Sequence, residues 1–264
     1  MNKAQTRHYL SSSFIRRPLM WWRHRSITSN DVMLASYPRS GNSWARFLLY
    51  ELVTGKTADF NAINDPYSPC ADFPDFQKAP IISAFQGRLI KTHELYRKDY
   101  KRAIYIVRDP REVIISEYYY MVGRGLIKGT LNEFTDKFVT GKIHGYDTWN
   151  HHVMSWINAP ISDLLIVRYE DLKVEGRKTL AGIASFLNID TTIECLDLIL
   201  EHNTFQAMRK SEETLTHEAF RFVNSNARFV RQGQTNSWQD VLTPAQVEKI
   251  SMIMAPVMNQ LGYL

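Results

Sequence analysis

Cysteine is scarce in this sequence: Cys70 and Cys195 are the only two among its 264 residues. They stand far apart and lack the spacing of metal-binding cysteines, which argues against a disulfide framework and against a structural zinc site. The sequence also lacks an Asn-x-Ser/Thr sequon. These absences lead us to expect reduced thiols in a cytoplasmic protein.

Long hydrophobic runs are absent as well. No stretch is long enough to cross a bilayer, and none has the form of a signal-peptide core. Neither sign of charge is in large excess, since 32 Lys and Arg against 27 Asp and Glu give a net charge of +5. Such a surplus helps to attract a polyanionic nucleotide but does not indicate a nucleic-acid partner. We therefore expect no transmembrane segment and no nucleic-acid partner.

The first 30 residues differ from the rest of the chain. Much of the positive charge gathers there, at Arg7, Arg16, Arg17, Arg23 and Arg25. We predict an arm over 1–30 that packs Trp21 and Trp22 on the domain, with contact to an anionic membrane surface as the alternative. Residues 31–264, in a chain whose hydrophobic fraction is 44%, suit a single domain.

Apolar patterns alternate along the chain between strand and helix type. Nearly continuous apolar runs predict strands at 31–36, 88–91, 103–107 and 163–168. Helical spacing predicts helices at 43–54, 110–123, 148–157, 172–187, 191–201 and 244–260. This alternation indicates a three-layer α/β/α fold with a central, mostly parallel sheet. The stretches 55–87 and 209–240 are predicted to be irregular, and they are candidates for substrate walls or lids.

The most informative segment runs from Ser36 to Trp44 and reads Ser-Tyr-Pro-Arg-Ser-Gly-Asn-Ser-Trp. It lies between a predicted strand and a predicted helix. In such a loop, backbone N–H groups and the positive end of a helix dipole converge on one point, which suits a phosphate. Gly41 permits a close backbone approach, and Arg39 adds charged donors. The segment is therefore predicted to be a P-loop-like anion site.

A nucleoside-triphosphate P-loop is excluded by spacing. That motif needs a glycine, four residues, and then Gly-Lys-Ser/Thr. The only Gly-Lys-Thr is Gly55-Lys56-Thr57, and Tyr50 stands where the first glycine should be.

Two further segments also end predicted strands, where ligands of parallel sheets bind. One runs Arg88-Leu-Ile-Lys-Thr-His93. The other is Arg108-Asp109-Pro110, followed by Ser116 in the predicted helix. Taken alone, the histidine could be a structural hydrogen-bonding residue, and Asp109 could be a helix cap beside an ion-paired Arg108.

Later segments complete the pattern. They are Tyr169-Glu170-Asp171 after the last strand, Phe205 in Asn203-Thr204-Phe205, and Phe229-Val230-Arg231-Gln232-Gly233 followed by Trp238.

From Val32 to Trp238 these segments resemble, in order, the cytosolic-type sulfotransferases that use 3′-phosphoadenosine 5′-phosphosulfate (PAPS). That family carries Tyr-Pro-Lys-Ser-Gly-Thr-Thr-Trp, then Lys-Thr-His, Arg-Asn/Asp-Pro with a later serine, Tyr-Glu-Asp, and Arg-Lys-Gly. Here Arg39 replaces the lysine of the loop, while Asn42 and Ser43 replace its threonines. Arginine presents a planar fork rather than a point charge, so its contact with the donor can differ.

The resemblance implies a set of residues that bind the donor PAPS and its product, 3′-phosphoadenosine 5′-phosphate (PAP). The loop would hold the 5′-phosphosulfate, aromatic side chains the adenine, and the later arginines with a serine the 3′-phosphate. The set is Arg39, Ser40, Gly41, Asn42, Ser43, Trp44, Thr92, Arg108, Ser116, Tyr169, Phe205, Arg231 and Gly233.

The same resemblance implies that His93, Lys91 and Arg39 are catalytic. Sulfuryl transfer, like phosphoryl transfer, should pass through a loose in-line transition state, so positioning and charge stabilisation dominate. Histidine is suited to take the proton of the acceptor, and cations can stabilise charge on the bridging oxygen. Because a sulfuryl group carries less negative charge than a phosphoryl group, no metal ion is expected to be required. Glu94 is the rival base.

The acceptor is less defined. We expect a hydroxyl or amine of a small molecule, with a microbial secondary metabolite as one candidate. Residues 56–86 interleave carboxylates with aromatic side chains, which would suit a cationic acceptor or form a solvated loop anchored by its aromatics. A dimer through the segment after Trp238 is doubtful, because Gln239 and Pro244 replace residues of the family's dimer segment. The alternative function is a nucleotide-dependent small-molecule kinase, in which Asp109 or Asp171 would hold magnesium.

Overall fold

The structure is a computed structural model, and the residues that it describes are 24–72, 75–143, 145–213, 222–223, 227–231, 233 and 235–264. Most of the predicted N-terminal arm, including both of its tryptophans, lies outside these residues.

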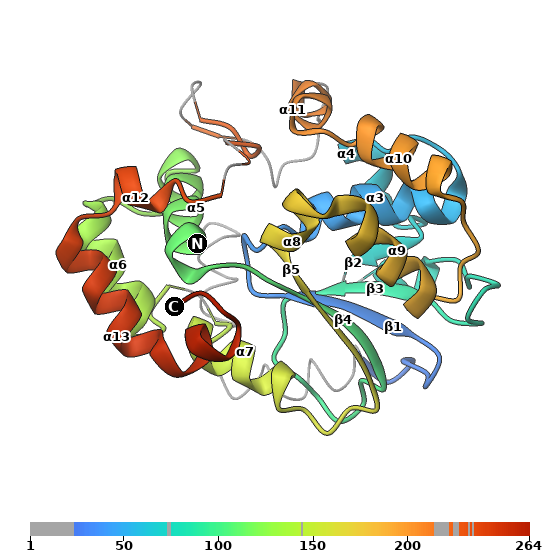
Figure 1. The fold of residues 1–264 in the computed structure, drawn as a ribbon, viewed down its shortest axis with the longest axis horizontal. Coiled ribbons are helices and arrows are strands. Elements are labelled where there is room, and N and C mark those ends of the chain that lie inside the picture. Colours follow the sequence, from blue (N-terminus) through green and yellow to red (C-terminus); the bar gives the residue numbers. More distant parts are fainter. Residues whose placement is uncertain are drawn as a thin grey trace.

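A five-stranded sheet forms the centre of the fold (Figure 1). Its strands are β1 (Val32–Ser36), β2 (Cys70–Asp72), β3 (Leu89–Thr92), β4 (Arg102–Val107) and β5 (Asp163–Arg168). They lie in the order β2-β3-β1-β4-β5, and every neighbouring pair is parallel. The predicted parallel sheet and its four predicted strands are therefore confirmed, while β2 was not predicted.

Helices account for most of the remaining described elements. They are α3 (Asn42–Thr54), α4 (Phe60–Asn64), α5 (Pro110–Gly123), α6 (Leu131–Val139), α7 (Trp149–Ile157), α8 (Tyr169–Val174), α9 (Gly176–Phe186), α10 (Ile193–His202), α11 (Phe205–Glu213), α12 (Trp238–Val241) and α13 (Pro244–Gln260), with a 3₁₀ turn η1 (Asp75–Lys78).

Two sequence predictions about these elements were wrong. The predicted helix 172–187 is two helices, α8 and α9, because Glu175 leaves the helical region with φ −117° and ψ 44°. The stretch 55–87, predicted to be irregular, contains α4, β2 and η1. Likewise, α11 and α12 occupy the two ends of 209–240.

Alternate residues of each strand face opposite layers, as the pleat of a strand requires. On one face, Met33 and Ala35 of β1 pack in a cluster with residues of α5, α6, α7 and α13. On the other face, Val32 and Leu34 pack with residues of α3 and α9. The structure therefore has the predicted three layers.

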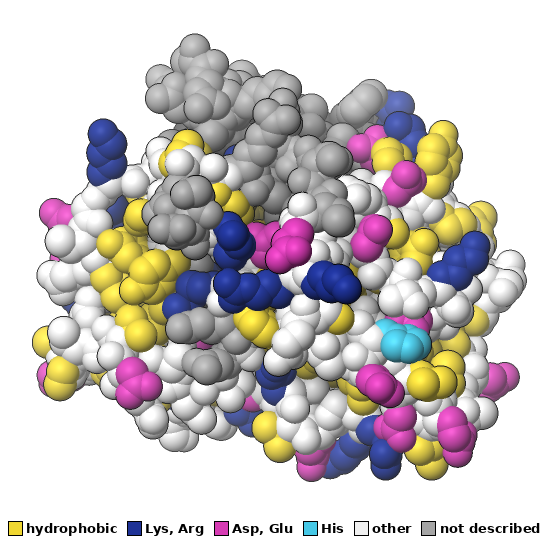
Figure 2. Space-filling view, turned by 90° about the horizontal axis from the view of Figure 1, so that it is seen from above, with side chains coloured by type: hydrophobic (Ala, Val, Ile, Leu, Met, Phe, Trp, Pro, Cys, Tyr) yellow, Lys and Arg dark blue, Asp and Glu magenta, His cyan; other side chains and the backbone are white. Residues whose placement is uncertain are grey.

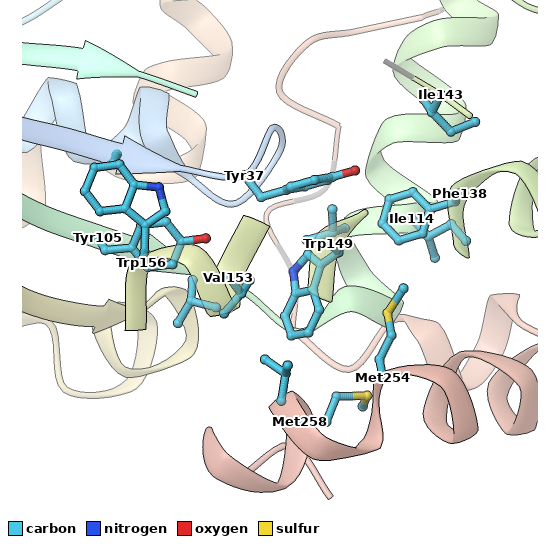
Figure 3. Close-up of a cluster of buried hydrophobic side chains, with 14 of the residues drawn as sticks. Tyr37, Tyr105, Ile114, Phe138, Ile143, Trp149, Val153, Trp156, Met254 and Met258 are labelled. Atoms are coloured by element: carbon cyan, nitrogen blue, oxygen red, sulfur yellow. The ribbon is translucent and has the colours of Figure 1, made fainter. Parts of the chain in front are cut away.

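The larger cluster is rich in aromatic side chains and methionines (Figure 3). Trp149 and Trp156 of α7 are fully buried in it, as are Met254 and Met258 of α13. Tyr37, the first residue after β1, is 1% exposed and meets Phe138 edge-on, with ring centroids 5.9 Å apart. This cluster therefore anchors the base of the loop that follows β1.

The described residues include no helix that is both long and apolar enough to cross a membrane.

Candidate donor-binding and catalytic site

The predicted motifs meet at the carboxyl edge of the sheet. The loop 37–41 follows β1, His93 follows β3, Arg108 follows β4, and Tyr169 follows β5. Because these strands are parallel, their carboxyl ends share one edge. The central strand β1 has β3 on one side and β4 on the other, which is the switch point where ligands of open parallel sheets bind.

The loop leaves the start of helix α3 open to an anion. Gly41 occupies the N-cap position in the left-handed region, with φ 98°, and no side chain caps the helix. A Cβ at this position would lie 2.4 Å from the ring of Tyr169, so only glycine fits. The hydroxyl of Ser40 is fully buried and has no hydrogen-bond partner among the described residues. A buried polar atom without a partner beside uncapped amides fits a phosphate or sulfate group.

Asn42 and Ser43 form the first turn of α3. The amide nitrogen of the Asn42 side chain donates to the Leu34 carbonyl at 3.3 Å and to the Ser36 hydroxyl at 3.1 Å. Asn42 therefore ties the start of the helix back to strand β1. Its side-chain oxygen is buried without a hydrogen-bond partner in the described part of the chain.

Arg39 crosses from the loop to helix α5. Its Nε donates to the hydroxyl of Ser116 at 3.1 Å, and its Nη2 donates to the carbonyl of Phe229 at 2.9 Å. The guanidinium lies over the rings of Tyr120 and Phe229, 4.6 and 4.4 Å from their centroids. Burial lowers the pKa of Arg39, and the charge of Glu117 opposes that effect. Arg39 and Ser116, predicted at opposite ends of the donor, are therefore in direct contact.

Arg108 lies beside this pair. Its Nη1 donates to the Arg39 carbonyl at 3.3 Å, and its Nη2 donates to Glu112 at 3.2 Å. The guanidinium stands over the ring of Tyr169 at 4.4 Å. Asp109 caps α5 by accepting from the Arg111 N–H, so the capping interpretation of Arg-Asp-Pro is correct. The phosphate-binding role of Arg108 stays a prediction.

Arg231 belongs to the same group of cations. Its guanidinium lies 4.9 Å over the ring of Tyr119. Burial lowers the pKa of Arg231; Tyr119 and Glu112 oppose this effect, and the nearby charges of Arg108 and Arg39 add to it. Three arginines thus act on one region, as a polyanion site requires. In Figure 2, Lys and Arg side chains form a band across the middle of the face seen from above.

The predicted adenine-binding aromatics lie on neighbouring helices. Trp44 donates from its indole to the Asn203 carbonyl at 2.9 Å and meets Tyr169 edge-on, with centroids 5.6 Å apart. Phe205 begins α11 and packs against Gly233, where a Cβ would lie 2.4 Å from the Phe205 ring. Gly233 has φ 61°, so both its backbone and its surroundings favour glycine.

His93 is fixed by its Nδ1. The nearest acceptor is the Ser36 carbonyl at 2.8 Å, with the Ser36 hydroxyl at 3.3 Å. Because a carbonyl only accepts, Nδ1 carries the proton and the basic lone pair is on Nε2. The ring of Tyr146 meets the imidazole edge-on at 5.9 Å.

A second histidine supports this segment and was missed in the sequence. His152 is fully buried in α7, and its Nε2 donates to the His93 carbonyl at 3.0 Å. The hydroxyl of Tyr105 lies 2.9 Å from its Nδ1, which therefore accepts. Trp156 donates to the Glu94 carbonyl at 3.0 Å. The backbone at the predicted base and at the residue after it is therefore held by α7.

Lys91 and Thr92 have partners in the protein. The Nζ of Lys91 lies 2.8 Å from Asp72 at the end of β2. The hydroxyl of Thr92 accepts from the Glu94 N–H at 3.0 Å. Asp72 belongs to the insert predicted to face the acceptor, and this ion pair joins the insert to the predicted catalytic lysine.

Other carboxylates of the insert have local structural uses. Asp59 caps α4 and accepts from the Ala62 N–H, Asp65 accepts from the Tyr67 N–H, and Asp75 pairs with Lys78. These contacts fit the alternative of a solvated, anchored loop.

Helix α5 contributes two glutamates that the sequence motifs did not include. Glu112 is 2% exposed and accepts from Arg108 and from residues at the start of α12. Glu117 is 4% exposed, and its Oε2 has no hydrogen-bond partner within the described residues. Burial raises the pKa of Glu117 to about 7, against the lowering effect of Arg39. The available signal was a glutamate directly before the apolar run Val113-Ile114-Ile115 and another just after Ser116, which follows that run.

Comparison with known proteins agrees with this geometry. The sulfotransferase domain model matches residues 29–262. The chain belongs to the sulfotransferase family. It is 26% identical to Sulfotransferase 2A6 of Mus musculus over 250 residues, which cover 86% of this chain and 84% of that protein. It is 30% identical to Sulfotransferase 1E1 of Homo sapiens over 241 residues, which cover 83% and 81%.

The fold is also that of solved sulfotransferases. The mouse sulfotransferase SULT7A1, whose structure was solved in complex with PAP, superposes with a TM-score of 0.67 at 22% identity over 88% of this chain and 84% of that one. The predicted sulfotransferase family, fold class and sulfuryl-transfer reaction are thus confirmed. The kinase alternative is not favoured.

Proposed function

We propose that this sulfotransferase moves a sulfuryl group from PAPS to a hydroxyl or amine of a small molecule. The observation that carries the proposal is that Arg39, Arg108 and Arg231 lie close enough to interact beside the anion loop, whose helix α3 starts uncapped, at the sheet edge that also carries His93. A nucleotide with anionic groups at both ends matches such a cluster.

The donor would be held from two sides. The loop amides, Ser40 and Arg39 suit its 5′-phosphosulfate, since the hydroxyl is buried without a partner and the amides are uncapped. Arg108 and Arg231 suit the 3′-phosphate. Ser116, which the resemblance assigns to the same phosphate, contacts Arg39. When bound, the donor supplies an activated sulfuryl group on its 5′-phosphate.

The protein's own contribution is a base, cations and position. His93, with its proton on Nδ1, carries its basic lone pair on Nε2, which would take the acceptor's proton. Arg39 lies on the phosphosulfate loop, and Lys91 precedes His93 by two residues on β3. Both would stabilise charge that grows on the bridging oxygen as the nucleotide leaves. We infer that this charge stabilisation makes a metal ion unnecessary.

The charge of the acceptor and the cellular setting are each proposed from one or two residues. Asp72 and Glu94 are carboxylates near the predicted catalytic residues, and they are the basis for proposing a cationic acceptor. Burial raises the pKa of the Cys70 thiol to about 11, which suits a reduced structural thiol. We therefore propose a reducing, cytoplasmic setting.

Binding calorimetry separates this function from the kinase alternative. The wild-type chain is titrated with PAP and with ATP, each with and without magnesium. We expect PAP to bind more tightly than ATP and independently of magnesium. Tighter binding of ATP that needs magnesium would overturn the proposal. A screen of phenols, alcohols and amines with sulfur-labelled PAPS then identifies the acceptor class, and inclusion of charged and neutral amines tests its cationic character.

A further inference from the structure

Glu112 is a buried carboxylate in the first turn of α5 with donors from two separate parts of the chain. Arg108, four residues earlier, donates from Nη2 to Oε2 at 3.2 Å. Ser237 lies with its hydroxyl 3.1 and 3.0 Å from the two carboxylate oxygens, and the Trp238 N–H donates to Oε1 at 2.9 Å. The carboxylate is therefore saturated by hydrogen bonds that span 125 residues of sequence.

A charge in this place is not explained by stability alone. Taking a carboxylate out of water is costly, and replacing a buried ion pair by apolar side chains is often neutral or stabilising. Glu112 also places a negative charge near Arg108 and Arg231, where an incoming anion would be repelled. If Glu112 contributes to donor binding, it must do so by holding other residues in position and not by attracting the donor.

Glu112 connects two parts of the site. One carboxylate fixes the guanidinium of Arg108 and, through Ser237 and Trp238, the start of α12. The ring of Trp238 is held a second time, because Arg111 lies 4.0 Å over it. Arg231 lies only six residues before Ser237. The positions of the two arginines that would bind the 3′-phosphate thus both depend on the carboxylate of Glu112 in α5.

We propose that Glu112 is a positioning residue for recognition of the 3′-phosphate, acting through Arg108 and the Ser237–Trp238 anchor. The proposal rests on the proposed donor. It assigns the preference for a 3′-phosphorylated nucleotide to a residue that does not itself contact the nucleotide.

The test compares two ligands that differ only in that phosphate. The dissociation constants of PAP and of adenosine 5′-phosphate are measured by calorimetry for the wild type and for Glu112→Gln and Glu112→Ala. The ratio of the dissociation constant of adenosine 5′-phosphate to that of PAP reports the contribution of the 3′-phosphate. We expect this ratio to fall about tenfold to a hundredfold in the variants, while adenosine 5′-phosphate binds within about threefold of the wild type. In turnover, the KM for PAPS should rise with kcat nearly unchanged.

Ser237→Ala is the second variant and leaves no unpaired charge. It removes one hydrogen bond from the same carboxylate, so the ratio should fall about threefold to tenfold. The effects of Ser237→Ala and Glu112→Gln should be non-additive, because both act on one anchor. If the Glu112 variants do not fold, Ser237→Ala decides the proposal alone.

Glu51→Gln serves as the matched control. Glu51 is a buried carboxylate of α3 that accepts from Asn203 at 2.7 Å and lies 2.6 Å from His202. This variant should leave the ligand ratio unchanged.

The inference is overturned if the ratio stays at its wild-type value in the Glu112 and Ser237 variants, whether both ligands bind less tightly or neither changes. A wild-type protein with no preference for PAP over adenosine 5′-phosphate would instead contradict the proposed donor.

Discussion

The imidazole of His93 donates from Nδ1 to the carbonyl oxygen of Ser36, with 2.8 Å between the two atoms. This hydrogen bond joins the residue after β3 to the last residue of β1. It fixes the tautomer and the ring orientation of the proposed base through the geometry of the sheet itself. The base and the anion loop, which begins one residue after Ser36, are therefore held by one contact.

Replacing His93 by alanine should stop turnover while donor binding persists. General-base catalysis typically contributes a factor of about 10² to 10⁴, so kcat should fall by at least about a hundredfold. The PAP dissociation constant should stay within about threefold, because the loop and arginines remain. Steady-state kinetics and calorimetry on the same preparation measure both. Glu94→Ala is the comparison, and loss of turnover in that variant with survival in His93→Ala would reverse the assignment.

Replacing Arg39 by lysine should cost affinity, and replacing it by alanine should cost much more. Lysine keeps the charge but loses the Nε bond to Ser116 and the planar contact with Tyr120 and Phe229. We expect PAP to bind about tenfold more weakly to Arg39→Lys and at least about a hundredfold more weakly to Arg39→Ala. Calorimetric dissociation constants of both variants measure this.

Arg177→Lys is the control for the loss of a guanidinium fork. Arg177 pairs with Asp197 on the exterior through two contacts of 2.6 and 2.7 Å, so PAP binding should not change. Wild-type affinity in both Arg39 variants would remove Arg39 from the donor site.

The central strands β1 and β4 could be predicted because they are apolar runs buried on both faces. All five residues of Val32–Ser36 are buried, as are the last five of Arg102–Val107. Strand β2 could not be predicted, because Cys70–Asp72 is too short to show a pattern and exists by pairing with β3. The break at Glu175 was hidden for a similar reason, since the apolar spacing continues from α8 into α9.

The site residues also divide into those that could be predicted from the sequence and those that could not. Arg39, His93 and Arg108 could be placed together because they follow parallel strands, whose ends share an edge. The roles of Glu112 and His152 depend on contacts with distant segments, which local sequence does not encode. The Lys91–Asp72 ion pair likewise required β2 to be known.

Replacing Gly41 by alanine should damage both folding and donor binding. The residue has φ 98°, and a Cβ would lie 2.4 Å from the Tyr169 ring. The backbone strain alone costs about 1–3 kcal/mol, and displacement of Tyr169 disturbs the ring beneath Arg108. We expect a lower melting temperature and at least about tenfold weaker PAP binding, measured by thermal unfolding and calorimetry.

Gly182→Ala is the matched control for Gly41→Ala. Gly182 lies inside α9 with nothing within 4 Å of a Cβ, so alanine there should raise stability by about 0.5–1 kcal/mol. It should leave PAP binding unchanged. Equal effects of the two substitutions would contradict the close approach of the loop.

Glu117→Gln should become relatively more stable than the wild type as pH rises. Burial raises the pKa of Glu117 to about 7 from an ordinary value of 4.5, while Arg39 opposes the shift. The folded state therefore holds this proton more tightly than the unfolded state, so wild-type stability falls as pH rises from about 4.5 through 7. Glutamine does not titrate. Between pH 5 and 8.5 the difference in unfolding free energy should move by about 1–3 kcal/mol in favour of the variant.

Denaturant unfolding of both proteins at the two pH values measures this difference, and Glu133→Gln provides the control. The Thr130 backbone N–H lowers the pKa of the exposed Glu133 carboxyl, so its stabilising effect is present above the ordinary pKa and is lost as pH falls. Glu133→Gln should therefore show no relative gain at pH 8.5. A difference between Glu117→Gln and the wild type that is the same at both pH values would mean that the Glu117 carboxyl ionises as it does in water. In that case its burial beside the anion loop would place no constraint on the charge of the site.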